Sequence, residues 1–372
     1  MSHLPAPADP VRVVLDHHIF ATQAYGGISR YFAGIAPLLG VHGIAPRIIA
    51  PLHQNAYIAE LPPSLVWGWR ISGFRGSRRL AMLIDDTLAA PLARAHGARI
   101  VHETYFSPRR HAPRGAAIVL TVYDMIHELF PETMQDPHTS RHKAAAIRRA
   151  DRILCISEST RRDLLRFFPE VESRTSVTLL GFDRLLANDT IPASSASRPY
   201  LLHVGARGGY KNFAALLDAY ARSRRLPLDF DLVSVGTAPF SQNEAEVIAR
   251  HGLEQKVRLV QADDAGLKLL YSGAAAFVYP SLYEGFGIPP LEAMSANCPV
   301  IVVDRSSVPE VCGEAAEYSS DGSSETLRIA IEAVVYSIER TAKLRTAGKT
   351  RLADFSWERT AAATAACYWE LA

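Results

Sequence analysis

The stretch Tyr279-Pro-Ser-Leu-Tyr-Glu284-Gly-Phe-Gly-Ile-Pro-Pro-Leu-Glu292-Ala-Met-Ser-Ala-Asn297 lies between two short apolar runs, at residues 275–279 and 299–303. Uninterrupted apolar runs of this length are typical of buried parallel strands. The stretch itself has room for one short helix, because Pro289-Pro290 suits the first helical positions and Asn297 tolerates the left-handed conformation that ends a helix. The sequence therefore predicts a strand, a glycine-rich loop, a helix and a second strand, as in an α/β fold.

Two carboxylates, Glu284 and Glu292, stand eight residues apart in this stretch. We expect Glu284 in the loop and Glu292 in the first turn of the helix. In open α/β sheets, ligands bind at the carboxyl ends of the strands. Both carboxylates should thus lie where a ligand is expected. A favourable interaction with the helix dipole is the purely structural alternative for Glu292.

Strand-like and helical stretches alternate along the chain, beginning with an apolar run at residues 11–15, the Gly26-Gly27 loop and a helix predicted over residues 28–39. This alternation is typical of βαβ units. Residues 186–199 interrupt it with small, polar and proline residues, which indicate an interdomain linker. We predict an α/β protein with two Rossmann-like, doubly wound domains facing across a cleft. The predicted boundaries are residues 1–188 for the first domain, 189–199 for the linker and 200–355 for the second domain.

The composition is that of an ordinary globular protein, with 372 residues, 48% hydrophobic residues, 21% charged residues and a net charge of +2. A charge this close to neutral gives no sign of nucleic-acid binding. The four cysteines stand singly among apolar neighbours, which favours buried, reduced thiols. The chain has no apolar leader at its start and no apolar run of membrane-spanning length, which predicts a soluble, cytoplasmic protein.

A second charged group follows the first predicted strand of the second domain, in Gly205-Ala-Arg207-Gly-Gly-Tyr-Lys211-Asn212. Because that strand should be parallel to the one ending at Tyr279, we expect Arg207 and Lys211 at the same sheet edge as Glu284. A guanidinium and an ammonium suit a diphosphate, and a carboxylate accepts hydrogen bonds from sugar hydroxyls. A nucleoside diphosphate sugar offers both kinds of group. Each cation taken singly has the alternative of a solvated loop charge.

The backbone amides of Phe286, Gly287 and Ile288 are further donors for the phosphates. Pro289-Pro290 removes two amides from the start of the helix. We therefore expect the diphosphate to depend mainly on the side-chain cations.

In these residues the chain resembles the retaining nucleotide-sugar glycosyltransferases of family 4, which have the GT-B fold, and it is similar to polysaccharide-assembly mannosyltransferases. The likeness is carried by the E-x7-E pair with its Glu-Gly-Phe-Gly core and by the arginine and lysine of the preceding glycine loop. It extends from Gly26-Gly27 through Thr121-Val-Tyr-Asp124 and Cys155-Ile-Ser-Glu-Ser-Thr160 to Phe355-Ser-Trp-Glu358. In that family the last motif leads a terminal helix back to the first domain, which implies that residues 356–372 pack there.

The resemblance also implies a role for each site residue. Arg207 and Lys211 would hold the diphosphate and stabilise it as the leaving group. Glu292 would bind the ribose hydroxyls, and Glu284 would contact the transferred sugar near the reacting carbon. Gly26-Gly27 would let the N-terminal loop approach the phosphates closely. No metal and no cofactor are expected.

The chain departs from the family at one position. Many relatives carry a histidine directly before the aspartate of the Thr-x-x-Asp strand end, where this chain has Tyr123 before Asp124. The nearest histidine is His127. Tyr123 and His127 are therefore alternative candidates for contact with the sugar or acceptor, with Asp124 beside them. Packing and helix capping are the structural alternatives for all three.

The predicted function is transfer of mannose, or a related hexose or deoxyhexose, from a GDP- or UDP-linked donor to a glycan or lipid-linked acceptor in cell-surface polysaccharide or lipopolysaccharide synthesis. A nucleotide-sugar epimerase of the same fold and a non-catalytic two-domain sugar-binding protein are the alternatives. A dehydrogenase is disfavoured because neither Gly285-Phe-Gly287 nor Gly205-Ala-Arg-Gly208 continues as G-x-G-x-x-G. Asp229-Phe-Asp231 has the letters of a metal-binding Asp-x-Asp, but it precedes an apolar run and is expected to open a strand.

A basic aromatic segment, Trp67-Gly-Trp69-Arg70 followed by Arg75, Arg78 and Arg79, lies in the first domain. It suggests a peripheral contact with the inner face of a membrane or with a lipid-linked acceptor. A surface loop with a packed tryptophan is the alternative.

Overall fold

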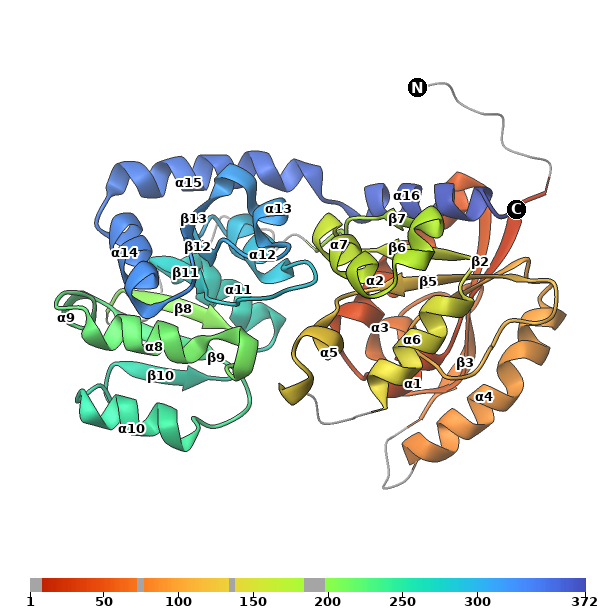
Figure 1. The fold of residues 1–372 in the computed structure, drawn as a ribbon, viewed down its shortest axis with the longest axis horizontal. Helices are drawn as coiled ribbons and strands as arrows, with labels where there is room; N and C mark the ends of the chain where they lie inside the picture. Colours follow the sequence, from red (N-terminus) through yellow and green to blue (C-terminus); the bar gives the residue numbers. More distant parts are fainter. Residues whose placement is uncertain (1–8, 72–76, 134–137, 184–197) are drawn as a thin grey trace. The chain divides into compact units, whose positions relative to one another are not determined.

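The computed structural model describes residues 9–71, 77–133, 138–183 and 198–372 (Figure 1). The chain divides into two compact units, Met1–Gly181 with Ser356–Ala372, and Phe182–Phe355. Each unit is built on one parallel sheet with helical crossovers (Figure 1), so the predicted fold class of two Rossmann-like α/β domains is confirmed. Most of the predicted linker, residues 189–197, lies outside the described residues.

The sheet of the first unit has the order β3-β2-β1-β4-β5-β6-β7 in the part of the chain that the structure describes, and all neighbouring strands are parallel. The chain starts in the middle of the sheet, builds outward to β3 and then returns past β1 to β4. Its strands are β1 Val11–Leu15, β2 Ile44–His53, β3 Val66–Arg70, β4 Ile100–Glu103, β5 Ala117–Val122, β6 Arg152–Cys155 and β7 Thr175–Val177.

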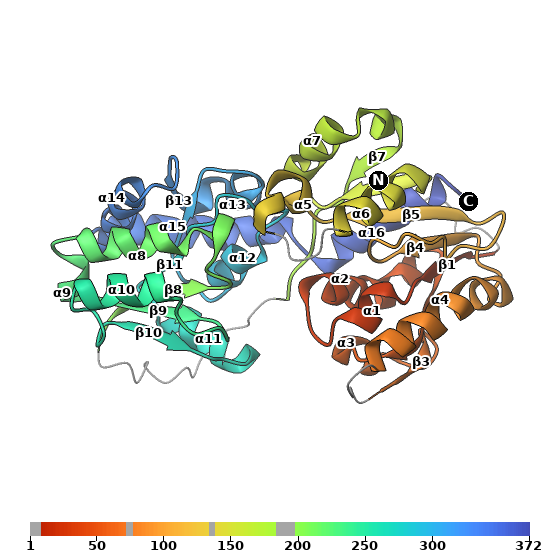
Figure 2. The ribbon, with the colours of Figure 1, turned by 60° about the horizontal axis from the view of Figure 1, so that its bottom comes forward.

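Helices cover this sheet, and α1 and α4 pack on β2 and against each other (Figure 2). The helical segments of the first unit are α1 His18–Thr22, α2 Gly27–Ile35, η1 Ala36–His42, α3 Ala56–Ala59, α4 Ser77–Ala95, α5 Ile126–Leu129, η2 Pro131–Thr133, α6 Thr139–Arg149, α7 Glu158–Phe167, η3 Pro169–Arg174 and α16 Trp357–Trp369.

The helix predicted over residues 28–39 is wrong in its second half. The α-helix α2 ends at Ile35, and the chain continues as the 3-10 segment η1. Pro37 explains the change, because proline has no amide hydrogen for an α-helical bond. Gly43, with φ 74°, then ends the segment in the left-handed conformation.

Helix α16 belongs to the first unit (Figure 1), as the resemblance implies. The Tyr368 hydroxyl on α16 lies 2.7 Å from Nδ1 of His102 on β4, and both side chains are fully buried. The Trp369 indole donates a hydrogen bond of 3.0 Å to the His42 carbonyl oxygen. Polar contacts as well as packing therefore hold α16 on this unit.

The sheet of the second unit has the order β10-β9-β8-β11-β12-β13, again with parallel neighbours throughout the described residues. Its strands are β8 Tyr200–Val204, β9 Asp231–Val235, β10 Val257–Val260, β11 Ala276–Tyr279, β12 Val300–Val303 and β13 Ala316–Ser319. Its helical segments are η4 Gly209–Lys211, α8 Phe213–Arg222, α9 Leu226–Asp229, α10 Gln242–Arg250, α11 Asp264–Gly273, α12 Ile288–Ser295, α13 Val308–Cys312, η5 Gly313–Ala315, α14 Ser324–Val335, α15 Ile338–Arg351 and η6 Leu352–Asp354.

The two apolar runs that flank the Glu284 stretch form β11 and β12, and every residue of both strands is buried. The chain adds β9 and β10 on one side of β8, and then adds β11, β12 and β13 on the other side. The order therefore reverses between β8 and β11, and such a reversal places a crevice at the carboxyl ends of the two strands.

Two further predictions concern the cysteines and the membrane. All four cysteines are buried free thiols, as predicted. No helix among the described residues is long and apolar enough to cross a membrane. In the basic aromatic segment, the Trp69 side chain on β3 is 63% exposed, whereas Arg75 and the side chains of Arg78 and Arg79 lie outside what the structure describes.

Replacement of Gly181 tests how tightly α16 is packed. A Cβ atom at Gly181 would lie 2.4 Å from the Trp357 backbone nitrogen, and a backbone atom cannot swing aside as a side chain can. We expect Gly181→Ala to destabilise the first unit by about 1–3 kcal/mol, measured as a lower midpoint of thermal or urea unfolding. Gly40→Ala is the matched control, because a Cβ atom there meets nothing within 4 Å. Equal stability of the two variants would contradict the packing that we describe.

Candidate functional site

Two loops leave the carboxyl edge of the second sheet side by side, because β8 and β11 are neighbours. The loop after β8 turns at Gly205, whose φ of 130° suits glycine. The Leu282 amide donates a hydrogen bond of 2.8 Å to the Tyr210 carbonyl oxygen, which ties the two loops together. The Asn212 side-chain amide adds a second link, 3.1 Å from the Pro280 carbonyl oxygen. The two loops thus form one structure.

Lys211 and Glu284 meet across these loops. The Lys211 ammonium donates to Oε1 of Glu284 at 2.6 Å, and the two side chains are 22% and 11% exposed. The Tyr279 hydroxyl, at the end of β11, also donates to Glu284; burial, together with this carboxylate, raises the pKa of Tyr279 well above its usual value. The structure therefore joins the lysine and the carboxylate that the sequence placed at one edge.

The loop after β12 holds the Glu284 loop from a third direction. The Glu284 amide donates to Oγ of Ser306 at 2.9 Å. The Ser307 hydroxyl contacts the carbonyl oxygens of Glu284 and Phe286, both at 2.8 Å, and Ser307 is fully buried. Residues at or after the ends of three neighbouring strands, β8, β11 and β12, thus fix the backbone and the carboxylate of Glu284.

Helix α12 begins one residue before the predicted proline start, so Glu292 does not lie in its first turn. Gly287, with φ 106°, precedes the helix, the proline pair occupies its beginning, and Asn297 is left-handed with φ 58°. Because α12 starts at Ile288, Glu292 is its fifth residue and lies in the second turn. The Tyr271 hydroxyl on α11 lies 3.4 Å from its carboxylate, so the dipole explanation for Glu292 is weakened.

Arg207 has a different partner from Lys211. Its guanidinium donates to Oε1 of Glu244 at 3.1 Å and to the carbonyl oxygens of Ala238 and Pro239. It also stacks over the Phe240 ring, 4.9 Å from the centroid. Only 8% of the Arg207 side chain is exposed. The two cations expected to act together therefore point to different neighbours in this structure.

An open hollow of about 760 Å³ lies on the Arg207 side of the site. It is lined by residues 235–237 at the end of β9, by residues 260–263 at the end of β10, and by three residues of α11. Gly236 in this lining adjoins Arg207, because a Cβ atom there would lie 3.5 Å from a guanidinium nitrogen. Arg207 thus adjoins the lining of the hollow, on the same loop that carries Lys211.

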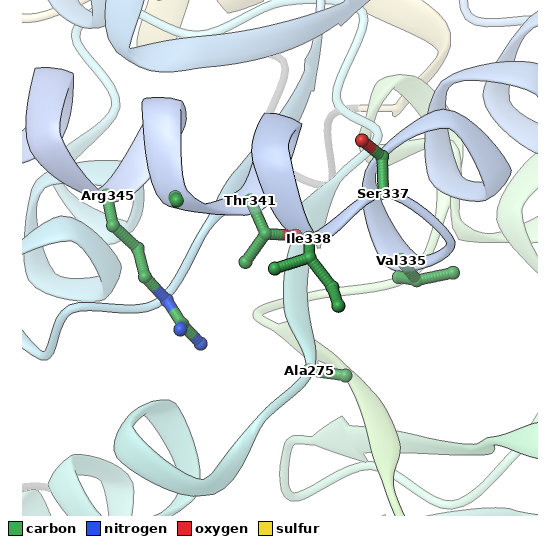
Figure 3. Close-up of a pocket in the computed structure, with 7 residues that line it drawn as sticks. Ala275, Val335, Ser337, Ile338, Thr341 and Arg345 are labelled. Atoms are coloured by element: carbon green, nitrogen blue, oxygen red, sulfur yellow. The ribbon is translucent and has the colours of Figure 1, made fainter.

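A smaller hollow of about 290 Å³ lies at the opposite end of β11 (Figure 3). Ala275, just before that strand, forms its floor, and Ile338, Thr341 and Arg345 of α15 line it. Because ligands of open α/β sheets bind at the carboxyl ends of the strands, this hollow is on the wrong edge for the predicted ligand.

In the first unit, Gly26 and Gly27 lie at the start of α2. A Cβ atom at Gly26 would lie 2.3 Å from the side-chain oxygen of Gln23, whereas one at Gly27 would meet nothing within 4 Å. A side chain at Gly26 would thus only require the flexible Gln23 side chain to move. The open space at Gly27 is compatible with the predicted approach of a ligand.

Tyr123, Asp124 and His127 lie at and after the end of β5. The Tyr123 hydroxyl donates to the Thr104 carbonyl oxygen at 2.9 Å, and the side chain is buried. Asp124 accepts from the Ile126 amide at 3.0 Å. His127 is partly exposed on α5. The structure thus gives Tyr123 and Asp124 structural contacts, and a contact of His127 with a ligand stays a prediction.

Several contacts of the site were missed from the sequence. The start of α10 could have been found, because Ser241 and Glu244 form a capping box there, but nothing in that motif signals the contact of Glu244 with Arg207. The contacts of Lys143 could not be found either: it is fully buried, 2.8 Å from Glu128, and donates to the Asp124 carbonyl oxygen. Nothing in the local sequence around Lys143 signals that burial. Asp231 opens β9, as predicted, and pairs with Arg198 and Arg258.

Two family models together match most of the chain. Residues 25–184 match the model described as Glycosyltransferase Family 4, and residues 188–351 match the model described as Glycosyl transferases group 1. The O-antigen chain mannosyltransferase B of Escherichia coli is 29% identical over 234 residues, which are 58% of this chain and 60% of that protein. The match thus spans less than two thirds of that relative's length.

Solved structures share the fold. Sucrose-phosphate synthase from Thermosynechococcus elongatus superposes with a TM-score of 0.76 at 18% identity, over 97% of this chain and 99% of that one. Anabaena Alr3699/HepE, in complex with UDP and glucose, gives a TM-score of 0.70 at 17% identity, over 96% of this chain and 99% of that one. At such identities the likeness establishes the GT-B fold alone.

Ser307 tests the support of the Glu284 loop. Ser307→Ala removes a buried hydroxyl that donates to the loop carbonyls and should cost about 1–3 kcal/mol. We expect faster amide hydrogen exchange at residues 284–287 and a lower midpoint of unfolding. Ser272→Ala is the control, because that hydroxyl contacts only the Lys268 carbonyl oxygen of its own helix. Unchanged exchange in the Ser307 variant would show that the loop does not need this contact.

Proposed function

We propose that this chain, which belongs to the glycosyltransferases of family 4, transfers a sugar from a nucleoside diphosphate donor to a glycan or lipid-linked acceptor. The observation that carries the proposal is the pairing of Lys211 with Glu284 at the reversal point of the second sheet, 2.6 Å apart. One group matches a phosphate and the other a sugar hydroxyl. A donor of this class presents both groups a few atoms apart.

Lys211 is the proposed stabiliser of the leaving group. In the structure its charge is balanced by Glu284, and both side chains remain partly exposed. When a donor binds, the ammonium would exchange part of this contact for a phosphate oxygen, and Glu284 would turn its freed oxygen to a sugar hydroxyl. Negative charge grows on the diphosphate as the bond to the sugar breaks, so the fixed cation stabilises the transition state more than the ground state.

Arg207 would bind the same diphosphate from the side of the larger hollow. Its contacts with Glu244 and the carbonyl oxygens fix the guanidinium beside Gly236. A cation held by such contacts needs no rearrangement to meet a ligand, which is the property that electrostatic catalysis requires. Glu244 is therefore a positioning residue in this proposal.

The nucleoside would occupy the larger hollow. Val235, Val260 and Leu269 offer it apolar contact, and the backbone and side chain of Gln261 offer hydrogen bonds to a base. Glu292 would bind the ribose hydroxyls from α12, as the family resemblance implies. The proposal covers both a guanosine and a uridine donor.

The proposed sugar is mannose or a related hexose, because a relative named as an O-antigen chain mannosyltransferase matches 58% of the chain. Transfer with retention is proposed from the family resemblance alone. The acceptor side is assigned to the first unit, with Gly27 and His127 as the residues to test. A peripheral contact of that unit with a membrane is part of the proposal and rests on the exposed Trp69.

Two other functions fit parts of the site. A nucleotide-sugar epimerase would also use the Lys211 and Glu284 pair, but it would form its product without an acceptor. A non-catalytic sugar-binding protein would not require the lysine beside the carboxylate. Product analysis with and without acceptor separates all three functions.

Replacement of Lys211 tests the proposed chemistry. We expect Lys211→Ala to fold normally and to lower the turnover number by roughly a hundredfold or more, the usual effect of losing one preorganised charge contact. Lys343→Ala, on the exposed face of α15, should leave turnover unchanged. Turnover of the Lys211 variant close to that of the wild type would refute the assigned role.

A thermal-shift screen with nucleoside diphosphates identifies the base of the donor. A ligand at a hundred times its dissociation constant adds about 2.7 kcal/mol to the free energy of unfolding. We expect GDP or UDP to raise the unfolding midpoint. In the Gln261→Ala variant, the midpoint shifts produced by GDP and by UDP should differ less than in the wild type. If no nucleoside diphosphate shifts the midpoint at millimolar concentration, the donor site is wrongly assigned.

A further inference from the structure

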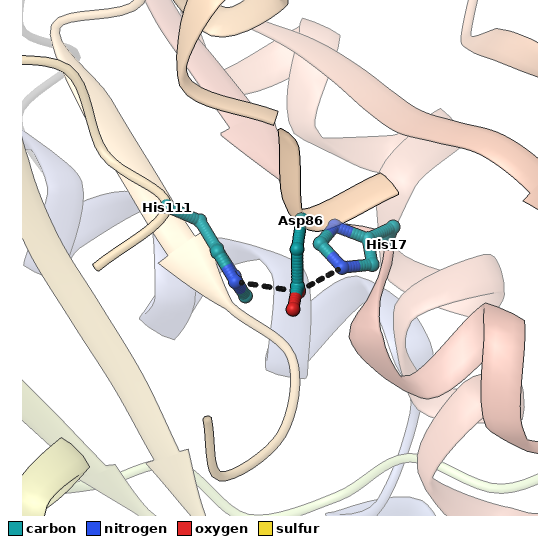
Figure 4. A group of neighbouring side chains, drawn as sticks. All are labelled: His17, Asp86 and His111. Atoms are coloured by element: carbon teal, nitrogen blue, oxygen red, sulfur yellow. Dashed lines mark hydrogen bonds and ion pairs between the residues drawn. The ribbon is translucent and has the colours of Figure 1, made fainter. Parts of the chain in front are cut away.

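Three side chains from separate segments of the first unit converge in its interior (Figure 4). His17 is the second residue after β1, Asp86 lies in the middle of α4, and His111 lies in the loop between β4 and β5. Within the described part of the chain, these are the residues whose ligand atoms form a group suited to a metal ion, all within 4.8 Å of one another. The family resemblance gives no role to any of the three.

The geometry centres on one oxygen atom. Nε2 of His17 lies 3.2 Å from Oδ1 of Asp86, and Nε2 of His111 lies 3.1 Å from the same oxygen (Figure 4). The two imidazole rings are close together, with centroids 4.7 Å apart. Two ring nitrogens and a carboxylate oxygen therefore surround one small volume, from three directions that the fold fixes independently.

We propose that His17, Asp86 and His111 bind a divalent transition-metal ion, with Zn²⁺ as the best match. Two imidazoles and one carboxylate form a ligand set found in protein zinc sites. Imidazole ligands favour zinc, nickel and copper over magnesium and calcium, which prefer oxygen. Three protein ligands leave a fourth position for water, which could enter beside Asp86, because its side chain is 16% exposed while the two histidines are buried.

The surroundings of His111 support this assignment. Its other ring nitrogen, Nδ1, lies 3.0 Å from Oδ2 of Asp16. Asp16 is itself held by the Thr104 amide at 2.8 Å and the Thr104 hydroxyl at 2.6 Å. A carboxylate on the second nitrogen of a metal-binding histidine is the usual arrangement, because it fixes the ring and its tautomer. The outer contacts of a metal site are thus present with the three ligands.

The charges fit a cation at this point. Asp16 and Asp86 together bring two negative charges to a largely buried place. The exposed Arg109 guanidinium lies 3.2 Å from Oδ2 of Asp86 and balances part of this charge. A divalent cation between the two histidines would balance the remainder.

The ion would link three segments at the carboxyl edge of the first sheet. β1 and β4 are neighbouring strands, and the proposed ligands join the turn after β1 to the loop after β4 and to α4. The role goes beyond sugar transfer: the metal would link these three segments, and the proposal does not depend on the donor chemistry of the second unit.

The test uses full-length protein without a histidine tag, stripped with a chelator and titrated with ZnCl₂ at neutral pH by calorimetry. We expect one ion per chain and a higher unfolding midpoint with zinc. His17→Gln and Asp86→Asn should each weaken binding at least tenfold. The control is the double variant His138→Gln, His142→Gln, which removes a surface histidine pair with rings 6.3 Å apart and should bind zinc as the wild type does.

Cobalt substitution keeps the test decisive if a variant fails to fold. Co²⁺ in a site of two imidazoles and a carboxylate gives visible absorption bands, and we expect them in the wild type and in the surface double variant. Absence of these bands in folded wild type, or zinc binding that survives in both His17→Gln and Asp86→Asn, would overturn the proposal. Loss of stoichiometric binding in the surface variant would do the same, because it would place the ion on α6.

Discussion

The candidate site depends on the reversal of strand order in the second sheet. β8 and β11 pair directly, although β9, β10 and their helices separate them in the chain. The helices that follow the two strands therefore lie on opposite faces of the sheet, and the loops part at the carboxyl edge. In this protein the Leu282 to Tyr210 backbone bond and the Lys211 to Glu284 pair hold the two loops together. Topology brings the loops to one edge of the sheet, and these two contacts fix their positions relative to each other.

The Lys211 to Glu284 pair lies in a rigid frame. Glu284 is nearly buried and Lys211 is 22% exposed, so the ammonium compensates a carboxylate that is largely removed from water. Tyr279, Ser306 and Ser307 also hold Glu284 in place. A donor that brings its own hydrogen bonds to both groups would replace this pairing while the frame stays in place.

The sequence predicted what periodicity and local chemistry determine. The buried strands on either side of Glu284, the proline start of α12 and its end at Asn297 follow from residue types at fixed spacing. The contact of Lys211 with Glu284 followed from one long-range assumption, that β8 and β11 are parallel. The turn that holds Glu292 was misplaced because α12 begins at Ile288, before the prolines.

Other contacts could not be predicted, because they depend on distances between segments far apart in the chain. Arg207 turns to Glu244, which is 37 residues away in sequence. His17, Asp86 and His111 come from three segments, and no spacing in the sequence connects them. Pattern analysis finds residues that act within one loop or between adjacent strand ends. It does not find a group whose members meet only through tertiary packing.

Burial separates two lysines that look alike in the sequence. Lys143 is completely buried beside Glu128 and Asp124, whose side chains are 10% and 24% exposed. Lys211 is 22% exposed, and its partner Glu284 is 11% exposed. The difference between the two sites therefore lies in the lysines and not in their carboxylates. No ligand can reach the Lys143 ammonium, whereas part of Lys211 is open to solvent, so its charge is available to a ligand.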